Sequence, residues 1–261
     1  MAARQLRRAE LAESLVDAPI SGARLCRTRE HLVVEAVLPV AIAEGPPCCH
    51  RYSFSAIRTA EKTISLRVGC EFRYQVTAPS PAIVQVRPRT DAAHRLVSET
   101  WATEPVLPLD EYDDVYGNGV KRLLMPEGEL QIRYDAVCEV PDALDPDASE
   151  APQLAVEALP GEVLHFLLPS RYCLSDLLMD EAWKLFGETE AGFARVQAVC
   201  DWVHENVRFQ YGTSNPKTTA VDVYRDRVGV CRDLTHLAVT FCRALNVPAR
   251  YVFGYLPDIG V

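Results

Sequence analysis

The decisive stretch of this chain is residues 229–246, which read GVCRDLTHLAVTFCRALN. Within it, apolar side chains recur at steps of three and four residues, as they do on one face of an α-helix. These residues are Leu234, Leu237, Ala238, Phe241 and Leu245. Asn246 comes next, and asparagine tolerates the left-handed conformation that often ends a helix. The stretch therefore predicts one buried helix that begins near Cys231.

Cys231 stands at the start of this predicted helix, directly after Gly229 and Val230. The positive end of a helix dipole favours the thiolate over the thiol, and the thiolate is the nucleophilic form of cysteine. The backbone N–H of Cys231 can also face the oxyanion that forms when a carbonyl is attacked. Gly229 would let a substrate backbone approach closely. We therefore take Cys231 as the candidate catalytic residue.

The elements on either side of this helix can be predicted as well. Residues 193–206 carry apolar side chains with helical spacing, which predicts an amphipathic helix that ends near Asn206. Thr219 and Asp222 have the spacing of a capping box, so a short helix is expected to start there and to end before Gly229. Residues 247–255 then read as a β-strand.

The region before these helices has a different period. Residues 64–76 and 130–140 alternate between apolar and polar side chains, which predicts two half-buried β-strands. Shorter apolar runs lie at residues 83–86 and 120–125, and the turn-forming residues 116–119 precede the second of them. The pattern predicts an antiparallel sheet or sandwich.

Residues 191–255 resemble the transglutaminase-like superfamily, whose core is papain-like. The matching motifs are WVHENV at 202–207, YG at 211–212, DVY at 222–224, GVCRD at 229–233 and LNVPARYV at 245–252. The β region before them is similar to the N-terminal β domain of the bacterial branch. The resemblance implies a cysteine that attacks a peptide or carboxamide carbonyl and forms a thioester, which water or an amine resolves. It also implies a histidine and an aspartate on strands that follow the cysteine helix.

We expect an α+β fold with three regions. Residues 1–62 form an N-terminal extension in which no structure can be read, and which we expect to be dispensable for the core. Residues 63–180 form an antiparallel β-sandwich-like domain. Residues 181–261 form the helical first half of a transglutaminase-like core, incomplete at its C-terminus.

The chain departs from the superfamily pattern after Cys231. Its only later histidine is His236, which is five positions along the predicted helix and about 140° around its axis from Cys231. We expect His236 to point to solvent, out of the reach that a general base needs. His204 is interpreted as a surface or core histidine, and Asp233 and Asp258 as solvated charges. This truncated chain is therefore expected to be inactive.

Other functions are compatible with the same residues. A non-catalytic protein could bind a partner through the β domain and keep the helical part as a relic. An acyl-CoA-dependent arylamine acyltransferase also places a cysteine on a helix, but no arginine- and glycine-rich approach of the expected kind precedes Cys231. Proteases, deamidases and crosslinking enzymes differ only in what resolves the thioester. The sequence leaves these three open.

The composition excludes several classes of protein. The chain has 27 Lys and Arg against 36 Asp and Glu, and an acidic chain without a basic stripe does not favour nucleic acid as a partner. The chain contains no run of about 18 apolar residues, which is the length that a membrane-spanning helix needs. The nine cysteines are scattered, with no CxxC pair and no signal peptide, which predicts reduced thiols in the cytoplasm.

We expect a peptide or protein substrate as the partner of this chain, and no cofactor. No acidic loop has the spacing of calcium ligands, so no metal is expected. If strands that should pair with residues 249–255 are missing, this apolar strand keeps an open edge. Such an edge would promote self-association.

Overall fold

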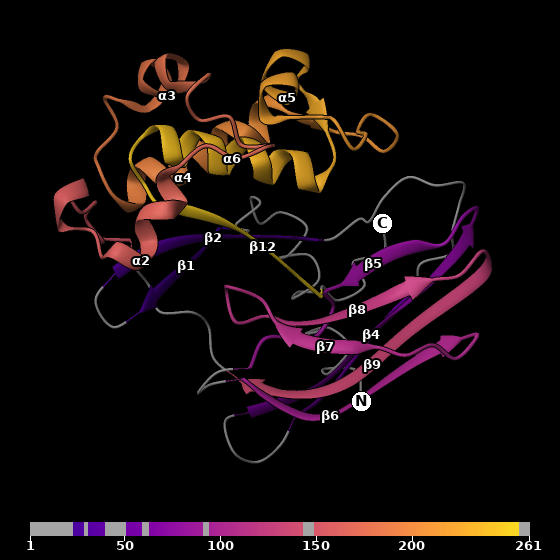
Figure 1. Ribbon diagram of the computed structural model, residues 1–261. Coiled ribbons are helices and arrows are strands. Elements are labelled where there is room, and N and C mark those ends of the chain that lie inside the picture. Colours follow the sequence, from indigo (N-terminus) through magenta and orange to yellow (C-terminus); the bar gives the residue numbers. More distant parts are fainter. Residues whose placement is uncertain are drawn as a thin grey trace, which may run out of the picture. The chain divides into compact units, whose positions relative to one another are not determined.

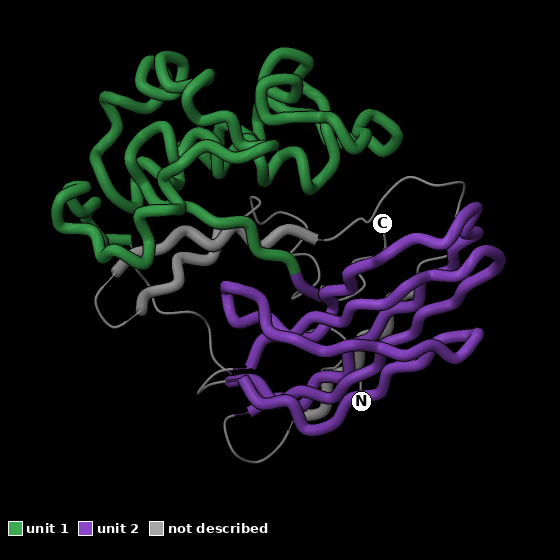
Figure 2. Tube along the Cα trace, viewed as in Figure 1, with its two compact units in different colours: residues 1–43, 145–253 green, residues 44–144, 254–261 purple. Residues whose placement is uncertain are grey.

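The computed structural model describes residues 63–90, 94–142 and 149–255, together with the backbone of three earlier strands at 23–28, 31–39 and 51–58. The chain divides into two compact units (Figure 2). The helical unit takes the described parts of residues 1–43 and 145–253, and the β unit those of residues 44–144 and 254–261. The division falls at residue 144, earlier than the boundary expected near residue 180, because residues 149–178 have little regular structure and hence no period to read.

The β unit consists of two antiparallel sheets (Figure 1). The larger has the strand order β3-β4-β9-β6, and the smaller has the order β5-β8-β7. The strands are β3 Arg51–Arg58, β4 Thr63–Val76, β5 Ser80–Val84, β6 Arg95–Glu104, β7 Asp110–Asp113, β8 Gly119–Met125 and β9 Gly128–Pro141. Both long strands predicted from period two are thus confirmed.

β4 and β9 organise this unit. They pair antiparallel along their whole length, from Thr63 opposite Pro141 to Val76 opposite Gly128. Because side chains alternate across a strand, every second residue faces the same side, and these residues are the buried ones. They include Val68, Cys70, Phe72 and Val76 of β4 and Leu130, Ile132, Tyr134, Ala136 and Cys138 of β9. Leu123 of β8 belongs to the same apolar cluster, so the two sheets share one core.

The helical unit contains short helices and three short strands besides β1 and β2. Its helices are η1 Val156–Ala158, α2 Gly161–Leu164, η2 His165–Leu167, α3 Met179–Phe186, α4 Phe193–Asn206, α5 Ala220–Asp226 and α6 Cys231–Ala244. Its other strands are β10 Arg208–Phe209, β11 Val228–Gly229 and β12 Ala249–Gly254. The predicted α+β class is confirmed, as are the helix ending at Asn206 and the helix starting at Cys231. Asn246 has a φ of 62°, as expected for the end of α6.

α6 is the central element of this unit (Figure 1) and contacts α3, α4, α5 and β2. Eleven of its fourteen residues are buried, so it has no exposed face of the kind that the apolar stripe predicted. A helix that is covered on all sides must place polar residues inside the protein too. This burial decides the environment of every functional candidate on α6.

Three aromatic rings from neighbouring helices surround Phe241 of α6 and fix the position of this helix. Phe241 is fully buried, and its ring centroid lies 5.4 Å from those of Phe186 and Trp202 and 5.8 Å from that of Tyr224. The three contacts are edge-to-face, which is a favourable geometry for aromatic pairs. α3, α4 and α5 are thus joined to α6 through one side chain.

The N-terminal region contains β1 Ala23–Thr28 and β2 His31–Pro39 in addition to β3. β1, β2 and β12 form a sheet in that order within the helical unit, and β3 pairs with β4 from Arg51 to Arg58. The region in which no structure could be read from the sequence thus contributes strands to the sheet of β12 and to the sheet of β4, and its dispensability for the core stays a prediction. Only one edge of β12 is covered, by β2, and β12 is the end strand among those described.

None of the helices in the described part of the chain has the length and apolar content needed to cross a bilayer.

Replacement of Phe241 by Ala should destabilise the protein more than replacement of the partly exposed Phe253 of β12. Removal of a buried phenylalanine ring typically costs about 3–5 kcal/mol, because the transfer free energy is lost and a cavity is left. Urea unfolding followed by circular dichroism measures both free energies. Equal losses in Phe241→Ala and Phe253→Ala would show that the ring cluster does not hold α6.

Candidate active site

Cys231 is the first residue of α6, and only 4% of its surface is exposed. β11 precedes it directly. β11 pairs in parallel with β10, with Phe209 opposite Gly229, and the Gln210 N–H donates a 2.9 Å hydrogen bond to the Gly229 carbonyl. The segment that follows α4 is therefore held beside the turn that carries the thiol.

The Asp233 carboxylate caps the start of α6. Its Oδ2 accepts a 2.9 Å hydrogen bond from the Val230 N–H, and its Oδ1 accepts one of 2.9 Å from the Ser214 hydroxyl. The interpretation of Asp233 as a solvated charge was wrong, since only 1% of its surface is exposed. The reason is that the first N–H groups of a buried helix need acceptors, and a carboxylate in the first turn supplies them.

Gly229 is fitted to this carboxylate. A Cβ atom at position 229 would lie 2.8 Å from the Cβ of Asp233, which is closer than such atoms approach. The missing side chain thus leaves room for Asp233 within the protein. The sequence offered another reason for glycine here, the approach of a substrate backbone, and that reason stays a prediction.

Arg232 joins the loop after β10 to the same helix end. One of its terminal nitrogens donates hydrogen bonds of 2.6 Å to the Ser214 hydroxyl and 2.9 Å to the Asn215 carbonyl. It also lies 3.2 Å from Oδ1 of Asp233, and its guanidinium carbon is 5.7 Å from the centre of the Tyr172 ring. Arg232 therefore neutralises the buried carboxylate while it anchors the loop.

His236 lies inside the helical unit between two tyrosines. Its ring is parallel to that of Tyr172 within 5°, with centroids 5.0 Å apart, and its centroid is 5.3 Å from that of Tyr251. The expectation that His236 points to solvent was wrong, since only 8% of its surface is exposed. The expectation from the apolar stripe assumed that the opposite face of the helix is exposed to solvent, whereas α6 has no exposed face. The Nδ1 atom of His236 is buried without a hydrogen bond to any described residue.

This environment lowers the pKa of His236 from 6.5 to about 4. The largest cause is burial, which disfavours the charged imidazolium. The charges of Arg232 and Arg243 lower it further, and the carboxylate of Asp233 acts in the opposite direction. His236 is therefore a neutral side chain at pH 7. Burial likewise raises the pKa of Tyr251 to about 12, and the electrostatic influence of Cys231 adds to this shift.

The other described cysteines are located differently from Cys231. Burial raises the pKa of Cys70 and of Cys200 to about 11, and it also raises the pKa of three further thiols. These are Cys138, Cys173 and Cys242. Cys231 alone among the six described cysteines stands at the first position of a helix.

His204 does not join the residues around Cys231. His204 is an exposed residue near the end of α4, and Asp258 lies outside the described residues. No sequence motif marks Ser214 or Tyr172, because they meet α6 through contacts with residues far along the chain. The capping box of Thr219 and Asp222, in contrast, is confirmed at the start of α5.

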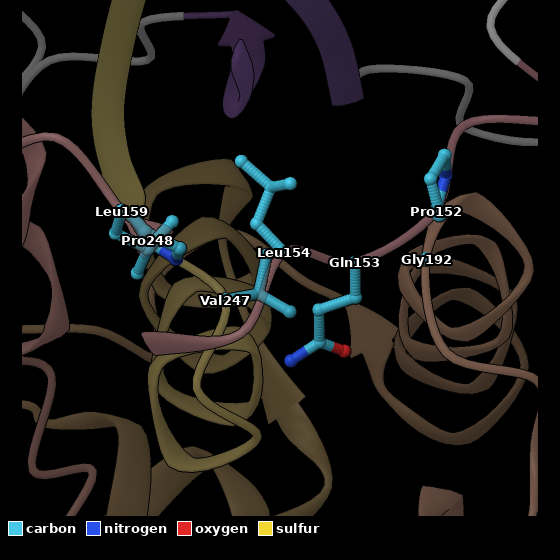
Figure 3. Close-up of a pocket in the computed structure, with 7 residues that line it drawn as sticks. All are labelled: Pro152, Gln153, Leu154, Leu159, Gly192, Val247 and Pro248. Atoms are coloured by element: carbon cyan, nitrogen blue, oxygen red, sulfur yellow. The ribbon is translucent and has the colours of Figure 1, made fainter. Parts of the chain in front are cut away.

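The helical unit contains a small pocket (Figure 3). Its lining residues are Pro152, Gln153, Leu154, Leu159, Gly192, Val247 and Pro248. Val247 and Pro248 follow the C-terminal end of α6, which at 1.5 Å per residue is about 20 Å from its first residue. The Gln153 amide is engaged in structural hydrogen bonds with the Leu245 carbonyl and with Arg195. The pocket is therefore separate from the candidate site.

The chain is similar to known proteins in sequence and in fold. Residues 183–260 match the core of the transglutaminase-like superfamily, a region that contains Cys231, Asp233 and His236. An uncharacterized protein of Mycobacterium leprae is 26% identical over 201 residues, which cover 73% of this chain and 71% of that protein. The crystal structure of a "putative cysteine protease" from Cytophaga hutchinsonii is similar, with a TM-score of 0.66 and 29% identity over 76% of this chain and 67% of that one.

Replacement of Asp233 by Ala should destabilise the protein by about 3 kcal/mol, because it leaves a buried N–H, a hydroxyl and an arginine without their acceptor. Asp233→Asn keeps the shape and one acceptor, so it should cost less. Asp222→Ala removes a more exposed cap of α5 and provides the matched control, at about 1 kcal/mol. Urea unfolding gives the three values. A loss in Asp233→Ala no larger than in Asp222→Ala would contradict the capping role.

His236 should make the protein less stable in mild acid. Below pH 6.5 the unfolded chain binds a proton at His236 that the folded protein does not bind until about pH 4. The contribution is therefore fully present above pH 6.5 and is lost as the pH falls through this window, by roughly 3 kcal/mol in total.

The variant His236→Phe keeps an aromatic ring against Tyr172 and cannot titrate. Its free energy of unfolding should fall less between pH 6.5 and pH 4 than that of the native protein. His204→Gln changes an exposed histidine and serves as the control. If the native and His236→Phe curves run parallel over this range, His236 does not cause the acid sensitivity.

Proposed function

We propose, from the transglutaminase-like superfamily to which the core at residues 183–260 belongs, that Cys231 is the nucleophile of a cysteine-dependent acyl transfer. The substrate would be a peptide or carboxamide bond. One observation carries the proposal: Cys231 is the first residue of a buried helix whose N-terminal turn is fixed by Asp233. The name given to the similar structure from Cytophaga hutchinsonii supports hydrolysis of peptide bonds as the reaction.

The chemistry follows from this position. The thiolate of Cys231 attacks the carbonyl carbon, and the carbonyl oxygen becomes an oxyanion near the N-terminus of α6. The tetrahedral intermediate collapses to a thioester as the amine leaves with a proton. Water then hydrolyses the thioester and regenerates the thiol, or an amine takes the acyl group.

Proton transfer is the part of this reaction that most needs a positioned side chain. The superfamily resemblance implies a histidine on a strand after the cysteine helix, whereas His236 is on α6 itself and is stacked on Tyr172. We therefore do not assign His236 as the general base. A positioned acid or base typically changes such a rate by about 10²-fold to 10⁴-fold, so the group that protonates the leaving amine decides how fast amides react.

An activated ester tests the nucleophile without this demand, because p-nitrophenolate leaves without prior protonation. Mixing the protein with a p-nitrophenyl ester of an N-acetyl amino acid should release p-nitrophenolate and leave one acyl group on Cys231. Intact-mass and peptide-mapping mass spectrometry locate the adduct. Cys231→Ala should lose the fast initial release of p-nitrophenolate that accompanies acylation of the thiol. Cys200→Ala, which removes the partly exposed cysteine of α4, should retain it.

The outcome that would reject the proposal is equally definite. Acylation of another cysteine at the native rate, or an unchanged fast phase in Cys231→Ala, would show that Cys231 is not the reactive thiol.

A further inference from the structure

Two exposed aromatic side chains lie on the segment that pairs with β11, the strand before the candidate nucleophile. Phe209 is 45% exposed and Tyr211 is 68% exposed. Their ring centroids are 5.0 Å apart, and the rings meet edge to face at 84°. They therefore form one apolar surface element, which we call the aromatic pair.

The chain path places the aromatic pair close to Cys231. Phe209 is the pairing partner of Gly229 in the β10–β11 ladder, and Gly229 is two residues before Cys231. The Gln210 N–H, between the two aromatic residues, donates to the Gly229 carbonyl. The backbone that carries the aromatic pair is thus hydrogen-bonded to the backbone that leads into α6.

A second set of contacts holds the other end of this segment. The Ser214 hydroxyl donates to Asp233 at 2.9 Å, and Arg232 donates to the Asn215 carbonyl at 2.9 Å. The Thr213 hydroxyl also bonds back to the Gln210 carbonyl at 2.8 Å. A segment that is tied at one end to β11 and at the other to the first turn of α6 presents its side chains in one arrangement before any ligand binds. Such preorganisation lowers the entropic cost of binding.

We propose that the aromatic pair is the specificity surface of the site and binds an aromatic or large aliphatic side chain next to the attacked carbonyl. This inference rests on the proposed function of Cys231. The substrate class is then a peptide with an apolar residue at the reacting position. An apolar side chain placed on the aromatic pair removes both surfaces from water and holds the carbonyl near the thiol, so it raises the rate of acylation.

The test compares two activated esters on the whole chain. The p-nitrophenyl esters of N-acetyl-phenylalanine and N-acetyl-glycine acylate the same thiol and differ in the side chain. Each rate is divided by that of the same ester with a small free thiol, which corrects for intrinsic reactivity. The native protein should prefer the phenylalanine ester by about 10-fold to 100-fold, a range typical of apolar pockets.

Replacement of the aromatic pair should remove this preference. In Phe209→Ala, in Tyr211→Ala and in the double variant, the phenylalanine ester should slow towards the glycine ester, whose rate stays near native. Tyr112→Ala changes an exposed tyrosine on β7 of the β unit and is the matched control. Circular dichroism and the retained glycine rate verify that the variants are folded.

Each other result has a defined meaning. An unchanged preference in the double variant, no preference in the native protein, or a faster reaction with the N-acetyl-aspartate ester overturns the inference and leaves Cys231 as the nucleophile. Absence of acylation by every ester overturns the proposed function and, with it, this inference.

Discussion

The hydrogen bonds of the Asp233 carboxylate are the contacts on which the rest of the site depends. A helix that starts inside a protein brings backbone N–H groups that water cannot reach, and they must find acceptors. Asp233 accepts from the Val230 N–H and from the Ser214 hydroxyl, and Arg232 balances its charge. One side chain thus stabilises the helix start, orders the loop after β10 and requires glycine at position 229.

The burial of α6 has two effects on the site. It keeps Cys231 at a fixed point, since the helix is held by contacts with α3, α4 and α5. The same burial forces the imidazole of His236 into a low-dielectric position where its neutral form is favoured. The stability of the core and the position of the candidate nucleophile therefore both depend on α6. A substitution that alters the packing of this helix affects both.

Much of this arrangement could be predicted from the sequence. The alternation of apolar and polar residues located β4 and β9. The helical spacing of apolar residues, together with capping residues at the helix ends, located α4, α5 and α6. β2 could not be predicted from alternation, since residues 31–39 are mostly apolar, whereas the short alternation of Tyr52, Phe54 and Ala56 with polar residues in β3 was missed. The burial of Asp233 and His236 depends on how many elements cover α6, which is a tertiary property that no local pattern encodes. Ser214 and Tyr172 were missed because their partners are distant in the chain.

The sheet of β1, β2 and β12 joins the two ends of the chain. About 210 residues separate the last residue of β2 from the first of β12, so this pairing is among the longest-range contacts of the fold. At a synthesis rate of about 5–20 residues per second, β2 would leave the ribosome roughly 10 to 40 s before β12 is made. During translation, the nascent chain would therefore expose one edge of the apolar strand β2, and this sheet would be completed only when β12 emerges.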